Sequence, residues 1–250
     1  MPLTIRQFPC LSDNYGFLFR DDASGLTGCV DTPDAGAVLA ALAQAGWGLD
    51  FILNTHWHPD HAGGNAQVRD VTGAKIIGPQ EVTRIAPLDR TVADGDVVEV
   101  GATRFEVIGC GGHTLGHIAY FAAEAHVAFV GDTLFALGCG RVFEGTAEQM
   151  WASLERLAAL PGDTSVYCAH EYTASNARFA LSVDQDAAVK TRAEAVFAAR
   201  ERGEATVPTT IAVERATNPF LRAPLLAGKP GAPDYEAFAA IRAAKDSFKG

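Results

Sequence analysis

The sequence predicts an α/β fold with two β-sheets, followed by a smaller domain built of helices alone. Short β-prone runs separated by turn residues fill the first two-thirds of the chain, with amphipathic helical segments between them. After Ala169 no strand-like run follows, and the remaining sequence is rich in Ala, Arg and Glu. We therefore expect a strand-rich domain over residues 1–172 and a helical domain over residues 173–250.

The predicted strands are short apolar or β-branched runs bounded by clusters of Gly, Asp, Asn or Ser. They are Leu3–Phe8, Tyr15–Arg20, Leu26–Asp31, Phe51–Thr55, Lys75–Gly78, Val97–Val100, Arg104–Ile108, Ile118–Ala122, Val127–Val130 and Ser165–Ala169. The Phe51–Thr55 strand runs directly into a histidine cluster, so its end is the first place to look for chemistry.

Helices are predicted where apolar residues recur at a spacing of three and four. Asp34–Ala45 has this spacing and stops at Gly46. A second helix begins near Thr146, which stands three residues before Gln149 as in a capping box, and Pro161-Gly162 ends it. In the second domain we expect helices over Thr173–Arg202, with a break near Ser182–Asp184, over Thr210–Arg215 and over Tyr235–Lys245.

The net charge of −10 is unevenly distributed along the chain. Residues 1–173 contain 9 Lys and Arg against 21 Asp and Glu, a net charge of −12, whereas residues 174–250 contain 11 against 9, a net charge of +2. Proteins that grip phosphate backbones are usually basic, so the charge argues against nucleic acid as a partner.

Nothing in the sequence suggests a membrane protein or a disulfide-rich secreted one. The first ten residues do not resemble a signal peptide, and the longest run without Asp, Glu, Lys or Arg, Val107–Ala123, is broken by two histidines and several glycines. The five cysteines are widely spaced, odd in number and without a C-x-x-C. We expect a cytoplasmic monomer with reduced, mostly buried thiols.

The most informative stretch is His56-Trp57-His58-Pro59-Asp60-His61. Neutral imidazole and carboxylate are the usual ligands of zinc and similar divalent ions. Three histidines and an aspartate within six residues cannot all face one way on a strand, but a loop could fold them around metal. This density favours two adjacent ions over one.

Three further fragments place a possible ligand at a strand end. They are Gly112-His113-Thr114, Gly131-Asp132-Thr133 and Ala169-His170-Glu171. Any one of these fragments is weak evidence for a metal site, because a lone histidine after a strand is often a buried residue whose hydrogen bonds are made within the core. Together with the first cluster they supply five histidines and two aspartates, enough for two ions that share a bridging ligand.

The order H-x-H-x-D-H, G-H-T, G-D-T and a final His resembles the metallo-β-lactamase superfamily. The resemblance covers residues 1–172 and implies an αβ/βα sandwich of two mixed sheets with the metal site at one edge. It also implies that His56, His58 and His113 hold one ion, that Asp60, His61 and His170 hold the second, and that Asp132 bridges them. His117 and His126 stay unassigned, the first as a metal-supporting or structural residue and the second as an exposed turn residue.

Narrower motifs resemble the glyoxalase II (hydroxyacylglutathione hydrolase) family from end to end. They are Ser12-Asp13-Asn14-Tyr15, Gly138-Cys139-Gly140-Arg141, His170-Glu171-Tyr172-Thr173, Asn218-Pro219-Phe220-Leu221-Arg222 and the terminal Ile241–Lys249. This resemblance implies hydrolysis of S-D-lactoylglutathione to glutathione and D-lactate, the second step of methylglyoxal detoxification. The small-molecule thioester is then the partner, with neither nucleic acid nor membrane.

The family resemblance also implies the residues that bind substrate. Arg141, Arg242 and Lys245 would hold the glutathione carboxylates, and Tyr172 would donate a hydrogen bond to the glutathione backbone. Arg242 and Lys245 stand three residues apart, so they share a face if Tyr235–Lys245 is helical. Phe143 departs from the family pattern, which often has Tyr there, so glutathione binding lacks that hydroxyl.

The expected cofactors are two divalent metal ions, best suited to Zn with Fe or Mn as possible substitutes, and a bridging hydroxide. A bound ion lowers the pKa of water to about 7, which supplies hydroxide for attack on the thioester carbonyl. Asp60 would hold metal and orient this hydroxide, and Asp132 would bridge the ions.

Other functions remain open at this stage. A mono-iron persulfide dioxygenase resembles the first domain but lacks the helical tail. A β-lactamase is disfavoured by the Asp at the bridging position, and a metal-dependent nuclease by the charge. A non-catalytic metal-stabilised binding module would not need an open site with two ions.

Overall fold

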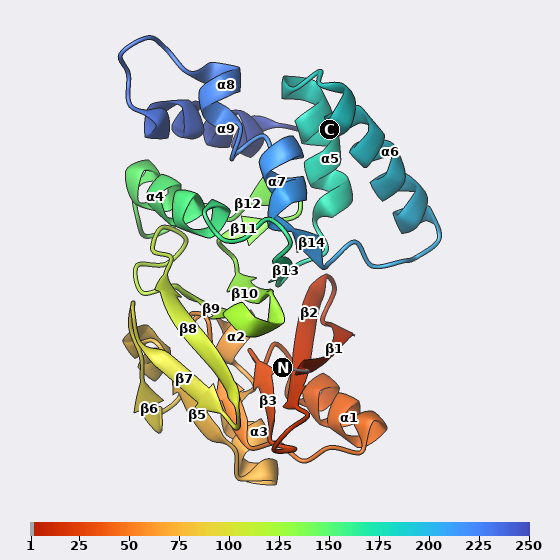
Figure 1. Cartoon of the computed structure of the whole chain (residues 1–250), viewed down its shortest axis with the longest axis vertical. Coiled ribbons are helices and arrows are strands. Elements are labelled where there is room, and N and C mark those ends of the chain that lie inside the picture. Colours follow the sequence, from red (N-terminus) through yellow and green to blue (C-terminus); the bar gives the residue numbers. More distant parts are fainter. Residues whose placement is uncertain (1–2) are drawn as a thin grey trace. The chain divides into compact units, whose positions relative to one another are not determined.

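The computed structural model describes residues 3–250 and divides the chain into two compact units (Figure 1). The first unit comprises Met1–Gly109 with Gly116–Gly131, and the second comprises Cys110–Leu115 with Asp132–Gly250. These units do not follow the division at residue 172, which stays a prediction. No helix within residues 3–250 is long and apolar enough to cross a membrane.

One sheet of the first unit is mixed, with its strands in sequence order. Its strands are β1 (Leu3–Cys10), β2 (Asn14–Asp21), β3 (Thr27–Val30), β4 (Phe51–Leu53), β5 (Lys75–Gly78) and β6 (Arg90–Thr91). The first three pair antiparallel, and β3 to β6 run parallel. Parallel neighbours need crossover connections, and the helices between β3 and β5 provide them.

The crossover helices are α1 (Ala35–Ala45), α2 (Pro59–Ala62) and α3 (Asn65–Thr72). The Asp34 side chain caps α1 by accepting a hydrogen bond from the Ala37 N–H, and Gly46 ends the helix in the left-handed region at φ 67°. Val38 and Leu42 of α1 and Val68 of α3 pack on Ile52 and Ile76 of the sheet. These contacts bury one face of the sheet.

The other sheet of the first unit is an antiparallel series formed by β7 (Val97–Val100), β8 (Thr103–Gly109), β9 (Ile118–Ala122) and β10 (Val127–Gly131). Phe105 of β8 and Phe129 of β10 pack on Phe19 of β2, with ring centroids 5.0 and 6.3 Å away. Because these three rings are fully buried between the sheets, they form the centre of a two-sheet core. The predicted two-sheet α/β fold is confirmed.

Helices and short strands make up the second unit. They are β11 (Leu134–Phe135), β12 (Gly138–Cys139), α4 (Ala147–Ala158), β13 (Ser165–Cys168), α5 (Thr173–Val183), α6 (Ala187–Glu201), β14 (Thr209–Thr210), α7 (Ile211–Thr217), α8 (Ala223–Ala227) and α9 (Asp234–Ser247). The capping box of Thr146 and Gln149 at the start of α4 is present, and Asp184 ends α5 at the predicted break.

The expectation that no strand follows Ala169 is wrong. β14 pairs antiparallel with β13, with Val166 opposite Thr209. The hairpin of β11 and β12 also escapes prediction. Each of β11, β12 and β14 has only two residues, which is too short for the alternation that marks a strand in sequence.

Candidate metal centre

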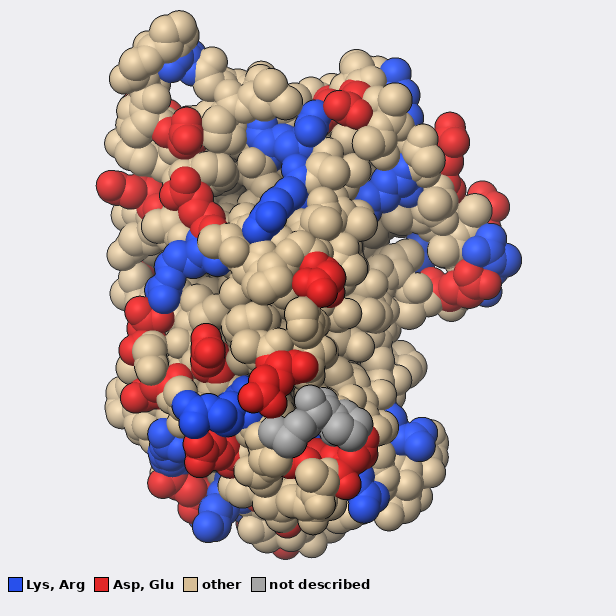
Figure 2. All heavy atoms as spheres, in the orientation of Figure 1, with Lys and Arg blue, Asp and Glu red and all other residues tan. Residues whose placement is uncertain are grey.

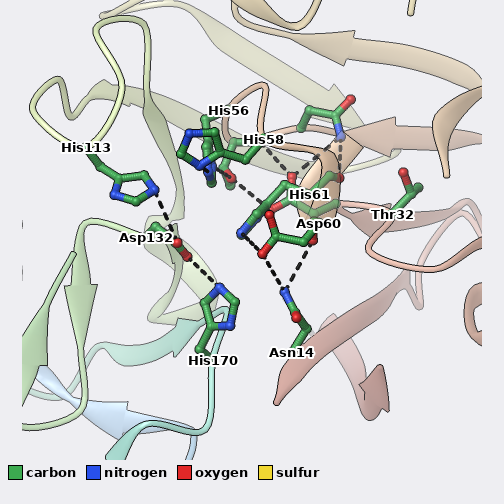
Figure 3. A network of polar contacts seen from close by, with 12 residues as sticks. Asn14, Thr32, His56, His58, Asp60, His61, His113, Asp132 and His170 are labelled. Atoms are coloured by element: carbon green, nitrogen blue, oxygen red, sulfur yellow. Dashed lines mark hydrogen bonds and ion pairs between the residues drawn. The ribbon is translucent and has the colours of Figure 1, made fainter. Parts of the chain in front are cut away.

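In the first unit the predicted ligands occupy the loop after β4 and the single turn of α2. His58 stands at the N-cap of α2, and Asp60 and His61 lie within its turn. The preceding loop is anchored from β9, because the Tyr120 hydroxyl donates to the Asn54 carbonyl at 2.9 Å. The strand end and the helical turn thus bring His56, His58, Asp60 and His61 together within one unit, as the dense spacing predicts (Figure 3).

Asp31, in the left-handed region at φ 59° just after β3, organises this loop. Its Oδ1 accepts the Thr55 N–H at 2.8 Å, and its Oδ2 accepts the Thr55 hydroxyl at 2.8 Å. The same Oδ2 lies 2.8 Å from His61 Nδ1. A buried carboxylate therefore holds both the loop backbone and one of the predicted ligands.

These contacts determine which ring nitrogens carry protons. His61 Nδ1 donates to the Asp31 carboxylate, which leaves Nε2 as the metal-binding atom. The Thr55 hydroxyl gives its proton to Asp31, so it can only accept from His56 Nδ1 at 3.0 Å. His56 Nε2 then carries a lone pair instead of a proton, and it lies 3.1 Å from His58 Nδ1. Two nitrogens that converge in this way suit a shared cation.

In the second unit Asp132 lies between two histidines (Figure 3). Its Oδ2 is 3.3 Å from His113 Nε2, and its Oδ1 is 3.4 Å from His170 Nε2. All three side chains are buried. Asp132 follows β10 and His170 follows β13, so both stand at strand ends, as predicted.

The donor chemistry of this group fits a metal ion. His113 Nδ1 lies 2.8 Å from the Arg141 carbonyl, which can only accept, so the proton is on Nδ1 and the Nε2 lone pair faces the Asp132 carboxylate. His113 Nε2 and Asp132 Oδ2 are then both acceptors, and at this separation they repel each other unless a positive charge lies between them. That charge can be a second proton on the imidazole or a metal ion. All seven predicted ligands belong to groups of His and Asp residues that could hold a metal ion.

Basic residues gather near the predicted substrate-binding positions of the second unit, and Figure 2 shows Lys and Arg side chains over the region of α5 and α9. Lys245 of α9 donates to the Ser175 carbonyl and hydroxyl, each at 3.2 Å. Its pKa falls to about 8, chiefly because burial disfavours the charge and also because Arg242, Arg178 and Arg141 are close.

The side chain of Arg242 is more buried than we expect for a residue that binds the substrate carboxylates. It is 8% exposed, and it donates to the Cys139 carbonyl at 3.0 Å and to Asp246 at 2.9 Å. Arg141, in contrast, is exposed and lines a cavity of about 270 Å³ with Val142, Phe143 and Asp246.

Two aromatic side chains flank the histidines of the second unit. The Phe143 ring is 61% exposed, with its centroid 5.2 Å from that of His113. Tyr172 stacks on His170 with centroids 4.7 Å apart and planes at 2°. Both rings therefore border predicted ligands and are also open to solvent.

Comparison with known proteins identifies the family. Residues 24–170 match the family model of the metallo-β-lactamase superfamily, and residues 171–248 match that of the hydroxyacylglutathione hydrolase C-terminus. A hydroxyacylglutathione hydrolase from Erythrobacter litoralis (strain HTCC2594) is 55% identical, with 98% of this chain and 100% of that protein covered. Another from Maricaulis maris (strain MCS10) is 54% identical, with 98% and 99% covered. The chain belongs to the hydroxyacylglutathione hydrolase family.

Its enzyme class, a thioester hydrolase, is thereby confirmed, as is the metallo-β-lactamase fold. Among solved structures, ETHE1 from Myxococcus xanthus superimposes with a TM-score of 0.71 at 29% identity, covering 96% of this chain and 90% of that one. In this hydroxyacylglutathione hydrolase family member, predicted ligands lie in the single turn of α2 and after the ends of β10 and β13.

Sequence reasoning missed Asp31, which contacts a predicted ligand, and left the role of His117 unassigned. Asp31 closes the predicted Leu26–Asp31 strand, and a carboxylate at the end of an apolar strand is the signal that could have found it. His117 is 1% exposed and stacks on His56 with centroids 4.6 Å apart, which places it against a ligand. His126 is exposed in the turn between β9 and β10, as predicted.

Proposed function

We propose that the chain hydrolyses S-D-lactoylglutathione to glutathione and D-lactate, as the second step of methylglyoxal detoxification. The proposal is carried by the arrangement of Asp132, whose two carboxylate oxygens each face the Nε2 atom of a buried histidine. A carboxylate with one oxygen for each of two ligand groups has the form of a bridging ligand between two ions. Relatives named hydroxyacylglutathione hydrolase, similar over nearly the full chain, support the choice of substrate.

The proposed site holds two divalent ions. His56, His58 and His113 would hold one, Asp60, His61 and His170 the other, and Asp132 would bridge them. Imidazole and carboxylate donors suit Zn, Fe and Mn, and Zn is our first choice. When bound, the two ions would supply Lewis acidity and, at neutral pH, the expected bridging hydroxide.

The protein's own contribution is to hold its donors rigid before substrate arrives. Asn14 donates to Asp60 Oδ2 at 3.2 Å and to the Asp60 carbonyl at 3.3 Å, which sets the plane of that carboxylate. Asp60 would orient the hydroxide so that its lone pair points toward the thioester carbonyl. The cysteines take no part, because the attack on carbon comes from water.

Glutathione would be anchored by residues of the second unit. Arg141 and Lys245 offer charge to its carboxylates, and Arg242 adds to the local positive field and holds the Cys139 carbonyl. Tyr172 would donate its hydroxyl to the peptide backbone of glutathione. Phe143 offers only a ring face.

The experiment is a thioesterase assay with S-D-lactoylglutathione and elemental analysis on the same sample. We expect about two divalent ions per chain and activity that disappears after chelation and returns with Zn, Fe or Mn. Full activity in metal-stripped protein would contradict the proposal. One iron per chain with oxygen consumption on glutathione persulfide, and no thioesterase activity, would instead favour the dioxygenase.

We further propose that the enzyme works as a cytoplasmic monomer whose partner is this small molecule alone. Size-exclusion chromatography with light scattering should give the mass of one 26.3 kDa chain. A stable dimer at micromolar concentration would refute the monomer.

A further inference from the structure

The hairpin of β11 and β12 is a buried element whose neighbours in sequence are site residues. Leu134 pairs with Cys139 and Phe135 with Gly138, so Ala136 and Leu137 form a two-residue turn. Leu137 adopts the left-handed region at φ 57°, which is uncommon for a branched apolar residue. An unusual backbone conformation of this kind persists only where the surroundings hold it.

Side chains from α5 and from α7 and its C-terminal end hydrogen-bond to backbone groups of this turn. Asn218 Nδ2, from the end of α7, lies 3.1 Å from the Phe135 carbonyl and 2.9 Å from the Gly138 carbonyl. Glu214 Oε2 accepts the Leu137 N–H at 2.9 Å. Asn176 of α5 donates to the Ala136 carbonyl at 3.1 Å.

Glu214 is itself fixed in place. It is fully buried, and its Oε1 accepts from the Arg192 guanidinium and from the Thr209 hydroxyl at 2.7 Å. Its Oε2 also accepts from Asn218 Nδ2 at 2.9 Å. A buried carboxylate with donors on both oxygens has one favourable orientation, so it is a rigid anchor for the turn.

The side chain of Leu137 reinforces the same attachment. It is fully buried in the cluster formed by Ala177 and Ala180 of α5 with Val189, Ala193 and Val196 of α6. The turn is therefore held by its backbone through α7 and by its side chain through α5 and α6.

Both ends of the hairpin lead to predicted metal ligands. The Gly140 N–H donates to the Thr133 carbonyl at 3.2 Å, and a Cβ at Gly140 would lie 1.9 Å from the Asp132 carbonyl oxygen. One residue further, the Arg141 carbonyl accepts from His113 Nδ1. A shift of the hairpin must therefore move the backbone of Asp132 and the acceptor that orients His113.

We propose that Glu214 and Asn218 are positioning residues for the metal ligands Asp132 and His113, acting through the β11–β12 hairpin. This inference rests on the proposed metal-dependent hydrolase function. It gives the helical part of the chain a role beyond holding substrate: it sets the geometry of two ligands that lie about 80 and 100 residues earlier in the sequence.

The first test is Glu214→Gln, with Asp184→Asn as a matched control. Each change turns a buried carboxylate into its amide and breaks an ion pair, with Arg192 or with Arg222, but only Glu214 contacts the hairpin. Both oxygens of Glu214 accept hydrogen bonds from donors, so the new NH₂ must face a donor in either orientation. Asn218→Ser is the second variant; it is milder, since it removes no charge and its hydroxyl can still donate one hydrogen bond.

We measure Zn affinity by chelator competition, kcat and KM of metal-saturated enzyme, and melting temperature. Glu214→Gln and Asn218→Ser should lower Zn affinity about 10-fold or more, with a lower kcat and a KM within about twofold of wild type. Asp184→Asn should melt earlier yet keep its Zn affinity.

If both hairpin variants melt earlier but bind Zn as wild type does, the two residues are merely structural and the inference is overturned. If Glu214→Gln fails to fold, Asn218→Ser decides alone. A wild-type protein that binds no metal would overturn the proposed function as well, whereas unaltered variants of a metal-binding wild type would overturn this inference only.

Discussion

Asp31 and His61 are joined by a 2.8 Å contact between Oδ2 and Nδ1, buried in the first unit. The carboxylate also accepts the hydroxyl of Thr55, which in turn accepts from His56. Two predicted ligands, each assigned to a different ion, thus owe the orientation of their rings to a single side chain. This relationship predicts that one substitution outside the ligand set weakens both ions.

Asp31→Asn should lower metal affinity about 10- to 100-fold, because the amide cannot serve as acceptor to the imidazole, the backbone N–H and the hydroxyl together. The metal affinity of the folded variant is measured by competition with a chelator. Asp50→Asn is the control, since Asp50 also accepts a threonine N–H and hydroxyl, those of Thr27, but contacts no ligand. Equal affinities in the two variants would refute the role of Asp31.

Asp132→Ala should remove the proposed bridging ligand. Metal-ion catalysis contributes several kcal/mol of transition-state stabilisation, and each 1.36 kcal/mol is a factor of ten in rate, so kcat should fall about 10³-fold or more. Elemental analysis should show fewer than two ions per chain. A variant that keeps two ions and at least a tenth of the wild-type kcat would contradict the bridge.

The sequence could predict those parts of the site that are local. H-x-H-x-D-H packs four ligands into six residues after an apolar strand, and a strand end with a one-turn helix is enough to arrange them. Asp31 could not be assigned, because its contact with His61 spans 30 residues and depends on the parallel pairing of β3 and β4. A contact of that kind exists only in the folded sheet.

The same limit explains the second unit. The predicted helix over Tyr235–Lys245 is confirmed by α9, which contains Arg242 and Lys245, but their spacing cannot show that Arg242 is buried against the Cys139 carbonyl. The β11–β12 hairpin leaves no pattern in the sequence, since its strands have two residues each and its turn is hydrogen-bonded to Asn218 and Glu214, about 80 residues later.

The pKa of Lys245, about 8, predicts how substrate binding depends on pH. Below pH 8 the ammonium is charged and would attract the carboxylates of the proposed glutathione substrate; above pH 8 the proton is lost, so kcat/KM should fall as pH rises through about 8. Among its charged neighbours, Arg242, Arg178 and Arg141 lower this pKa and Asp246 raises it. The fall should be about 10- to 100-fold, because a hydrogen bond to a charged group is worth about 1.5–3 kcal/mol.

The control for this profile is Lys245→Arg, which stays charged throughout and should remove the decline between pH 7 and 9.5. Lys245→Gln should have a low kcat/KM at every pH. If all three proteins lose activity in parallel above pH 8, the titrating group is elsewhere.

Phe143→Tyr should improve glutathione binding. The ring is 61% exposed beside His113, so an added hydroxyl meets no packing obstacle and can donate to the ligand. One neutral hydrogen bond is worth about 0.5–1.5 kcal/mol, so KM should fall by roughly 2- to 10-fold with kcat unchanged. Phe143→Leu, which removes the ring and adds no donor, is the comparison; a similar KM in both variants would show that the hydroxyl does not reach the substrate.

The cysteines supply a test of the proposed water-based mechanism. All five are buried, and none of them forms a disulfide. Burial raises the pKa of Cys10 and Cys168 to about 12 and that of Cys139 to about 11, so thiolate is scarce at neutral pH. Treatment of the native enzyme with iodoacetamide at pH 7 should therefore leave at least nine-tenths of the activity after an hour, with mass spectrometry showing modification only after unfolding. Rapid inactivation with one thiol alkylated would mean that a cysteine lies in the reaction path, and substitution of that residue by Ser would identify it.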